Sequence, residues 1–411
     1  MTDVSTTGLG AAFWRLWTSS ALSNLADGIV KVSLPLVALR FTSSPTLIGG
    51  LAFAVTLPWL FFALPAGALA DRLDRRRLML GANAVRALTL GVLAAAFAAG
   101  VGSIWVLYAV ALCLGTAETL YDTAAQSILP QVVPRDRLSR ANGRLIGAEI
   151  TANEFVGPPL GGFLVLAGAV TAFATPAGLW AVAIGALLLV PGPYRVDRVG
   201  RSTLRADVAE GLRFLWRHRL LRTLAGMVGT FNFASNAAWA VLVLYAVGPK
   251  SAVGLSEPAF GALLATSAAG MLAGSLVAER VEARLGRARA LLAATIGCAL
   301  LVAGPALTSN AVLIGTAFFV SGTCSAVWNV ITVSLRQRVT PDRLLGRLNS
   351  GYRLVAWGSR PLGALAGGLL AQALGVRAVF VVMTALTLAL VPVVTRVTDA
   401  RMDAAERAAS A

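Results

Sequence analysis

The sequence is poor in charged residues, and this scarcity is the first indication of its class. Only 13% of the 411 residues are Asp, Glu, Lys or Arg, and 57% are hydrophobic. A soluble domain usually carries about a quarter charged residues. Apolar runs of about 20 residues recur along nearly the whole chain, and each can cross the hydrocarbon core of a bilayer. Because backbone polar groups must be satisfied inside lipid, we expect these runs to be helices.

Residues that carry catalysis or bind metals are scarce as well. The chain has one histidine, His218, and three cysteines, Cys113, Cys298 and Cys324, each in a separate apolar run. This spacing fits neither a disulfide framework nor a metal site. No glycine-rich phosphate-binding loop followed by Lys and Ser or Thr is present, which excludes an ATP-driven pump. We therefore expect no enzymatic activity, no metal and no cofactor.

The apolar runs predict a polytopic membrane protein with twelve spans. Their approximate positions are 12–39, 46–70, 78–99, 103–128, 145–168, 170–191, 222–247, 259–279, 288–307, 309–333, 350–373 and 377–395. With a cytoplasmic N-terminus, 28 of the 35 basic residues lie in cytoplasmic segments and four lie within spans. The outer connections hold only Arg40, Lys250 and Arg377. Basic residues favour cytoplasmic loops, so both termini are predicted to be cytoplasmic. The net charge of +16 then reflects topology and does not indicate nucleic-acid binding.

A polar stretch at 193–221 separates two six-span halves. Leu204, Val208, Leu212 and Leu215 recur there at intervals of three to four residues among several arginines. This pattern predicts an amphipathic helix on the cytoplasmic membrane surface, which would also tether the two halves. We therefore expect an N-terminal bundle at 1–192, the linker at 193–221 and a C-terminal bundle at 222–411.

The two halves repeat one another at a nearly constant offset. Segment 131–138 (QVVPRDRL) returns at 337–344 as QRVTPDRL, and each copy leads to an asparagine, Asn142 or Asn349, and to a new span. Asn24 in span one corresponds in the same way to Asn232 in span seven. An even number of spans in each repeat gives both halves the same orientation. Parallel repeats of this kind place substrate sites near the bilayer midplane, between the halves.

The loop between spans two and three carries the main resemblance to a known family. Residues 67–77 read GALADRLDRRR, which resembles the signature loop of the major facilitator superfamily. Stretches at 13–17 (FWRLW), 129–134 (LPQVVP) and 157–162 (GPPLGG) resemble its bacterial branch of macrolide efflux pumps and the enterobactin exporter. The resemblance implies an all-α fold of twelve transmembrane helices in two six-helix bundles. It also implies solute transport by alternating access, commonly export coupled to inward proton flow.

By this resemblance, the signature loop and its copy at 278–284 are expected to act as a cytoplasmic gate. Asp71 could cap a neighbouring helix N-terminus and hold that side closed, or it could be a solvated loop charge. Gly67 would let two helices approach closely. The predicted gating residues are Gly67, Asp71, Arg72, Arg75, Arg76, Glu279 and Arg280.

Charged residues inside the spans are the sharper functional signal, because each costs at least about 2.5–3.5 kcal/mol to insert. Asp27 and Lys31 are four residues apart on one helix face. They either neutralise one another or leave Asp27 to exchange a proton. The candidates for proton coupling are Asp27, Glu118, Asp122 and Glu154.

Glu118 and Asp122 also share one helix face, so their repulsion should hold a proton on one of them. Arg86 is the expected counter-ion for one of this pair. Glu149 is shallower in its span, and we expect it to pair with Arg144 or Arg353.

Several polar and aromatic residues could line a central cavity, although helix-packing or lipid-facing positions explain the aromatic ones, Trp59, Phe231 and Trp239, equally well. The candidates are Asn24, Lys31, Trp59, Arg86, Phe231, Asn232, Asn236, Trp239 and Arg360. Arg360 either pairs with a carboxylate of the other half or contacts an anionic substrate. Pro158, Pro159 and Pro361 remove helix hydrogen bonds and mark either hinges or static kinks.

Together these features predict a monomeric transporter in the cytoplasmic membrane, which exports hydrophobic or amphipathic small molecules in exchange for protons. Two alternatives remain open: an importer or facilitator on the same scaffold, and a membrane receptor or structural subunit that does not transport. The excess of arginine over lysine, with abundant alanine and glycine, indicates a GC-rich bacterial genome.

Overall fold

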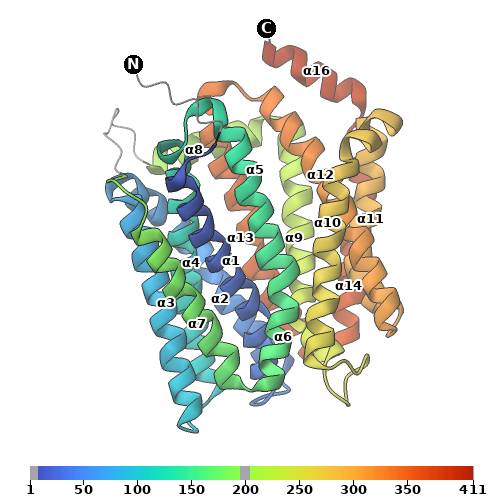
Figure 1. The fold of residues 1–411 in the computed structure, drawn as a ribbon. Coiled ribbons are helices and arrows are strands. Elements are labelled where there is room, and N and C mark those ends of the chain that lie inside the picture. Colours follow the sequence, from blue (N-terminus) through green and yellow to red (C-terminus); the bar gives the residue numbers. More distant parts are fainter. Residues whose placement is uncertain (1–7, 195–203, 411) are drawn as a thin grey trace. The chain divides into compact units, whose positions relative to one another are not determined.

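A computed structural model describes the backbone of residues 8–194 and 204–410 (Figure 1). The side chains of residues 63, 64, 67, 68, 70, 71, 135, 204–208, 342, 343, 345, 346, 350, 409 and 410 lie outside that description. The described residues are almost entirely helical, and their only β-type pairing is an isolated bridge between Val247 and Leu255. The all-α prediction is confirmed.

The first half of the chain contains nine helical segments. They are α1 (Ala11–Ala38), α2 (Pro45–Arg72), α3 (Arg75–Ala98), α4 (Ile104–Val132), η1 (Arg135–Arg137), α5 (Leu138–Glu149), the π-helix η2 (Ile150–Val156), α6 (Gly157–Ala167) and α7 (Ala169–Leu188). The linker and the second half contain α8 (Leu204–Arg217), α9 (Arg219–Ala246), α10 (Glu257–Leu285), α11 (Arg287–Leu307), α12 (Ala311–Val339), α13 (Asp342–Leu374), α14 (Val376–Leu388), α15 (Val391–Val394) and α16 (Asp399–Ser410).

Ten helices in the described part of the chain are long and apolar enough to cross a membrane. They correspond to ten of the twelve predicted spans. The prediction at 145–168 falls on α5, η2 and α6, where no α-helix runs uninterrupted for the whole length. The prediction at 350–373 falls within the 33-residue α13, which includes Arg347, Arg353 and Arg360. A count of twelve therefore remains a prediction.

The two proline motifs have different effects on their helices. The double proline at 158–159 follows directly on the seven-residue π-helix η2. Since proline has no N–H to donate, the preceding turn loses its regular i→i−4 bonds, and a π-helix is one way to absorb the change. Pro361, in contrast, lies inside a continuous α13. Sequence alone does not distinguish these outcomes.

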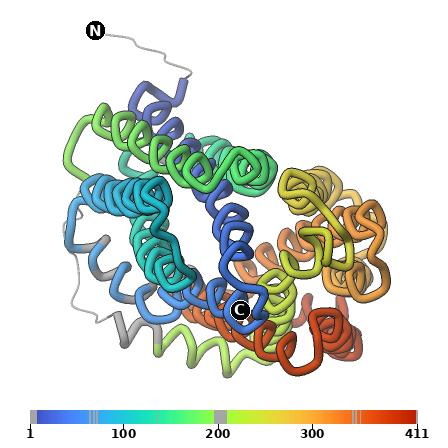
Figure 2. The backbone as a smooth tube through the Cα atoms, turned by 90° about the horizontal axis from the view of Figure 1, so that it is seen from below, coloured from blue at the N-terminus to red at the C-terminus, as the bar shows by residue number. Residues whose placement is uncertain are grey.

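The chain packs as two compact units. Unit 1 comprises Met1–Thr42, Ala54–Val199 and Glu257–Ala262, and unit 2 comprises Ser43–Phe53, Gly200–Ser256 and Leu263–Ala411. In unit 1, α3 packs against both α4 and α7, and α7 also packs against α1 (Figure 2). In unit 2, α13 packs along α9 and α8, and α11 packs along α12 and α14. Each unit has its own apolar core, which includes Phe13 and Met79 in unit 1 and Leu335 and Met402 in unit 2.

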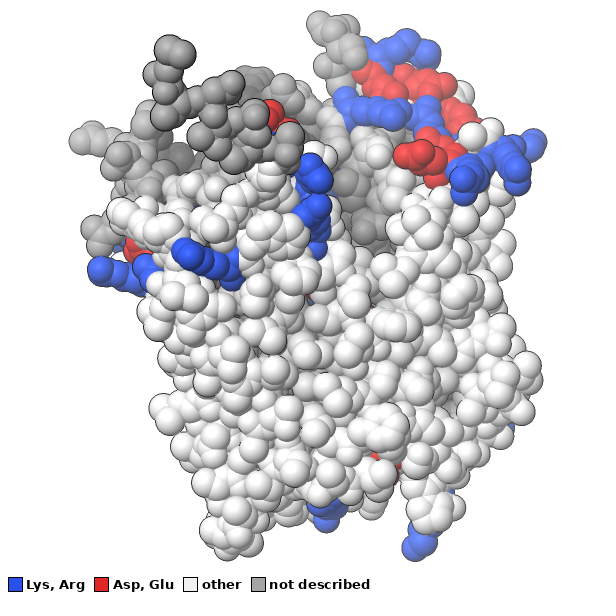
Figure 3. All heavy atoms as spheres, viewed as in Figure 1, with Lys and Arg blue, Asp and Glu red and all other residues white. Residues whose placement is uncertain are grey.

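The C-terminal helix α16 is held by charge in unit 2. Arg287, at the start of α11, forms ion pairs with Asp403 and Glu406 of α16. Helix α16 lies at the upper right of Figure 1, and in the same view red and blue spheres gather at the upper right of Figure 3, while most of the face shown below them is uncharged. On the apolar side of α16, Met402 is completely buried.

Candidate functional site

A buried arginine, Arg86, is the centre of a charged cluster in unit 1. It comes from α3, and 0% of its surface is exposed. Its guanidinium lies 5.1 Å from the ring centroid of Tyr121 on α4 and 5.4 Å from that of Trp180 on α7. Such cation–π contacts offset part of the cost of desolvation. A buried ion nevertheless requires a counter-charge close by.

Asp27 of α1 supplies that counter-charge. Its Oδ2 lies 3.4 Å from Nη1 of Arg86, which also donates to Oγ of Ser23 at 3.3 Å. Glu118 and Asp122, one turn apart on α4, interact electrostatically with the same guanidinium. Three carboxylates therefore share one buried cation, and the group as a whole is neutral only when two protons are bound.

A second ion pair connects α1 with the π-helix, one turn beyond Asp27. Nζ of Lys31 lies 2.6 Å from both carboxylate oxygens of Glu154. The two helices approach closely at Gly28, where a Cβ atom would lie 2.9 Å from Cα of Asn153. With 48% of the Lys31 side chain and 37% of that of Glu154 exposed, this pair is accessible to water or to a ligand.

These pairings differ from the one that spacing along α1 suggests. Asp27 and Lys31 lie on one face of α1, yet each forms its ion pair with a residue of another helix. Arg86 of α3 is the expected counter-ion of a carboxylate on α4. It interacts electrostatically with both carboxylates of α4, but its direct contact is with Asp27. Contacts between helices decide the partners, and distance along one helix does not reveal them.

Glu149 was expected to pair with a nearby arginine, and the structure gives a different environment. It interacts electrostatically with Glu154 and Glu118, which are carboxylates like itself. One expected partner, Arg144, lies over the ring of Trp14 at 4.8 Å. The end of α5 thus adds negative charge to the part of unit 1 that already holds the Arg86 cluster.

The predicted cavity asparagines are hydrogen-bonded to backbone. In unit 2, Nδ2 of Asn232 donates to the carbonyl of Ala356 at 2.6 Å, and Nδ2 of Asn236 donates to that of Asn232 at 2.9 Å. In unit 1, Nδ2 of Asn24 donates to the carbonyl of Ser20 at 2.9 Å. Their amide oxygens remain as the groups that could meet a substrate.

The aromatic candidates and Arg360 take part in ring contacts or are partly covered. Trp239 packs against Phe318, with ring centroids 5.3 Å apart. Trp59 and Phe231 are half-buried. Arg360 and Arg353 lie over the indole of Trp357, at 4.7 and 4.8 Å from the ring. The polar residues of α13 thus form an arginine–tryptophan–arginine stack.

In the signature loop, the charged residue that caps a helix is Asp74. It is the N-cap of α3, where Oδ1 accepts from the N–H of Arg77 at 3.0 Å and Oδ2 accepts from that of Tyr194 at 2.8 Å. The side chains of Gly67 and Asp71 lie outside the described residues, so their predicted gating role stays a prediction. Asp immediately before a helical run is an N-cap signature that could have identified Asp74 from sequence.

The arginines of this loop bind carbonyls at helix ends. Arg76 donates to the carbonyls of Leu187 and Leu188 at the end of α7, at 2.9 and 2.6 Å. Arg75 donates to the carbonyl of Ser127 near the end of α4. Cations at C-terminal helix ends are favoured by the helix dipole and by unpaired carbonyls. Arg72 is exposed.

The copy of this loop in unit 2 is organised differently. Glu279 and Arg280 are both exposed. Gly286, with φ of +76°, precedes α11 and has no side chain to cap it. The N–H of Ala288 is instead bonded by Oδ1 of Asp399, the first residue of α16, at 3.1 Å. The sequence copy therefore does not reproduce the interactions of the original.

The predicted linker helix is present as α8. Glu210 of α8 forms an ion pair with Arg347 of α13, and Leu215 is buried while Trp216 is exposed. The side chains of Leu204 and Val208 lie outside the described residues. A helix is present where one was predicted, and its amphipathic character and its contact with the membrane surface remain predictions.

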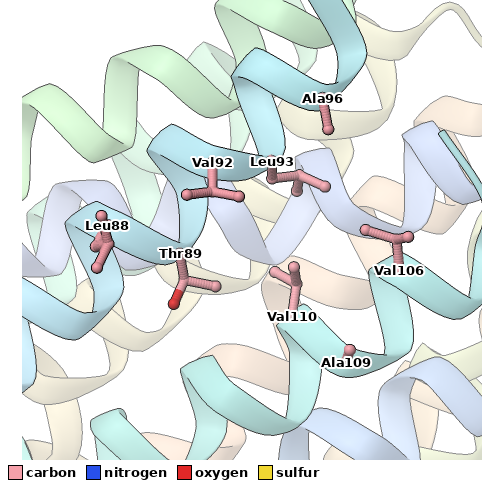
Figure 4. A pocket seen from close by; sticks show the side chains of 8 residues that line it. All are labelled: Leu88, Thr89, Val92, Leu93, Ala96, Val106, Ala109 and Val110. Carbon is pink, nitrogen blue, oxygen red and sulfur yellow. The ribbon is translucent and has the colours of Figure 1, made fainter. Parts of the chain in front are cut away.

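A groove of about 360 Å³ lies between α3 and α4 in unit 1 (Figure 4). Its lining is Leu88, Thr89, Val92, Leu93, Ala96, Val106, Ala109 and Val110. None of the predicted site residues is among them. An apolar lining with exposed Leu88 and Val92 on spanning helices suits acyl chains and offers almost no polar contact to a charged ligand.

Comparison with known families agrees with this architecture. The model of the family described as transmembrane secretion effector matches residues 9–411. The chain belongs to this family. Multidrug efflux pump Tap of Mycobacterium tuberculosis is 31% identical over 397 residues, covering 91% of this chain and 90% of the relative. The enterobactin exporter EntS of Citrobacter koseri is 26% identical over 363 residues, covering 87% and 85%.

Solved structures show the same fold at low sequence identity. The nucleoside transporter NupG gives a TM-score of 0.72 at 15% identity, covering 94% of this chain and 99% of that one. A bacterial homologue of the iron transporter ferroportin gives a TM-score of 0.73 at 16% identity, covering 95% and 99%. These matches concern the fold alone. The match to the secretion-effector family confirms the resemblance to the major facilitator superfamily.

Proposed function

We propose that this chain exports amphipathic small molecules across the cell membrane and that inward proton flow through the Arg86 cluster drives the export. Its relatives include a multidrug efflux pump and an enterobactin exporter, which supports export of small molecules. The observation that carries the coupling is the cluster of Asp27, Glu118 and Asp122 around one buried guanidinium.

The cluster can couple protons because its charge balance is incomplete. One arginine cannot neutralise three carboxylates, and each uncompensated charge in a buried site carries a large desolvation cost. Binding of protons lowers that cost, and release of protons restores it. A helix movement that changes the distance of Asp27 from Arg86 therefore changes proton affinity, which is the link that an antiporter requires.

Other residues of the proposal have supporting roles. The accessible Lys31–Glu154 pair and the oxygens of Asn24, Asn232 and Asn236 offer polar contacts for an amphipathic substrate. The loop around Arg72, Arg75 and Arg76 closes the cytoplasmic side. We further propose twelve spans with both termini in the cytoplasm, and a functional monomer.

The test is proton-coupled transport in proteoliposomes that contain a pH-sensitive dye. An inward proton gradient is imposed, a panel of lipophilic drugs and siderophore-like compounds is presented, and wild type is compared with Asp27→Asn, Glu118→Gln and Asp122→Asn. We expect substrate-dependent proton flux in the wild type. We expect Asp27→Asn to abolish that flux while a fluorescent substrate still binds.

Asp136→Asn is the matched control, because it removes an exposed carboxylate of unit 1 outside the cluster and should leave flux unchanged. Substrate movement that does not depend on the proton gradient and is unchanged in all three cluster variants would favour a facilitator. Absence of substrate binding and movement in every preparation would favour a receptor or structural subunit.

A further inference from the structure

Four buried polar atoms around Arg86 have no hydrogen-bond partner among the described residues. They are Nη2 of Arg86, Nδ2 of Asn83, Nε1 of Trp180 and the hydroxyl of Tyr121. No more than 2% of any of these residues is exposed, so bulk solvent does not reach them. Native proteins leave few buried polar groups unsatisfied, and each such group requires an explanation.

These atoms belong to one connected group of side chains. Oγ of Ser23 donates to Oδ1 of Asn83 at 3.2 Å and accepts from Nη1 of Arg86 at 3.3 Å. The rings of Tyr121 and Trp180 both lie against the same guanidinium. Separate helices do not usually gather unpaired polar atoms in one cluster by accident, because each buried polar atom left unsatisfied costs about 1–3 kcal/mol.

The chemistry of the four atoms selects the ligand. Three of them are N–H groups that can only donate, so the ligand must accept hydrogen bonds. An anion would be repelled by Asp27, Glu118 and Asp122, and a cation would face the Arg86 guanidinium and the donors themselves. The four side chains are also almost completely buried. A small, neutral acceptor meets these conditions, and water is the one that the cell supplies.

We infer that Arg86, Asn83, Trp180 and Tyr121 form a binding site for buried water, and that this water connects Asp27 with the carboxylates of α4. A water that accepts from one of these donors keeps a second lone pair for the O–H of a protonated carboxyl and its own two hydrogens for carboxylate oxygens. A proton from one carboxylic acid passes to the water, which releases another proton to the next carboxylate and is left unchanged. The water site stands on the geometry, and the relay rests on the proposed function.

The site is tested first by pulsed X-ray radiolysis of the purified protein in detergent, followed by mass spectrometry. Radicals formed from bound water modify adjacent side chains even when bulk solvent is excluded. We expect Tyr121 and Trp180 to be modified severalfold faster than Tyr245. Tyr245 is a matched control, because 3% of it is exposed and its hydroxyl donates to the carbonyl of Thr308 at 3.1 Å. Equal modification of Tyr121 and Tyr245 would overturn the water site.

The relay is tested by comparing Tyr121→Phe with Tyr245→Phe in the proteoliposome assay. We expect Tyr121→Phe to slow substrate-dependent proton flux severalfold and to shift its pH profile, with substrate affinity and melting temperature equal to those of Tyr245→Phe. Asn83→Leu provides a second variant if Tyr121→Phe misfolds. Fast modification with normal flux in both variants would overturn the relay. If wild type shows no coupled flux, the proposed function and the relay fail, while radiolysis still decides the water site.

Discussion

The two units bury positive charge by different means. Unit 1 surrounds Arg86 with carboxylates, and it places Asp27, Glu118 and Asp122 on helices that pack together. The helical interior of unit 2 has no Asp or Glu at 211–256, 283–341 or 343–398. There, Arg336 lies 4.1 Å over the ring of Tyr352, and Arg353 and Arg360 flank Trp357.

The buried charged groups of the two units therefore differ in whether they can exchange a proton. A carboxylate can gain and lose a proton, whereas an arginine side chain stays protonated in proteins. A stack of guanidinium and aromatic groups therefore holds charge without exchanging it. Side chains that can exchange a proton thus lie among the packed helices of unit 1, and the stacked arginines of unit 2 keep their charge.

Removal of the central cation should produce the largest effect. In Arg86→Met, three partly buried carboxylates lose their counter-ion, and breaking a buried pair costs about 3–5 kcal/mol. Arg336→Met removes a cation stacked on Tyr352 in unit 2, and a cation–π contact contributes only about 0.5–2 kcal/mol. The free energy of unfolding, measured by titration in mixed micelles, should fall more in Arg86→Met than in the unit 2 variant. Equal losses would remove the distinction between the units.

The helix caps of the two related loops offer a second contrast. Asp74 is buried and accepts from two N–H groups, so Asp74→Ala should cost about 2 kcal/mol, near the upper limit for a cap. Asp399 accepts from a single exposed N–H, so Asp399→Ala should cost about 0.5–1 kcal/mol. Thermal melts of both variants would measure the difference. A larger loss for Asp399→Ala would contradict the assignment of Asp74 as the main anchor.

The attachment of α16 is expected to be weaker and sensitive to salt. Arg287→Gln removes the ion pairs to Asp403 and Glu406, which are partly exposed and so contribute about 1 kcal/mol or less. Hydrogen exchange in α16 should accelerate, and raising the salt concentration should accelerate it in wild type too. Arg289→Gln, on an exposed neighbouring position, is the control. Unchanged exchange in Arg287→Gln would mean that apolar contacts of Met402 suffice.

The smallest effect concerns His218, the only histidine of the chain. Its Nδ1 caps α9 by accepting from the N–H of Leu221 at 3.4 Å, and partial burial lowers its pKa from 6.5. Because the folded state resists protonation, the cap is complete above pH 6.5 and weakens as the pH falls below that value. Hydrogen exchange of the amides in the first turn of α9, corrected for the intrinsic exchange rate, should therefore become faster as the pH is lowered.

His218→Asn keeps a capping side chain that does not titrate, and it should remove this local pH dependence. Since unit 1 contains no histidine, any pH-dependent change there near neutrality must come from its carboxylates. A pH response in unit 1 that survives Asp27→Asn, Glu118→Gln and Asp122→Asn together would contradict the comparison.

Much of the fold follows from the sequence because the lipid environment imposes simple rules. Apolar run length placed ten spans within a few residues of the observed helices, and the 3.6-residue pattern at 204–217 predicted α8. Run length and periodicity failed to foresee the π-helix at 150–156, because that register depends on tertiary packing, such as the close approach of Gly157 to Gly28 of α1. The signature motif likewise drew attention to Asp71 and away from Asp74.

For the candidate site, the sequence determined which residues are chemically able to act, and only the tertiary structure decided which of them meet. Ionisable residues in apolar runs are conspicuous because burial is costly, so Asp27, Arg86, Glu118 and Asp122 could all be named in advance. Tyr121, Trp180, Asn83 and Ser23 could not, since uncharged polar residues are common in spans and carry no such signal. Their significance comes from helix packing, which brings α1, α3, α4 and α7 together around one guanidinium.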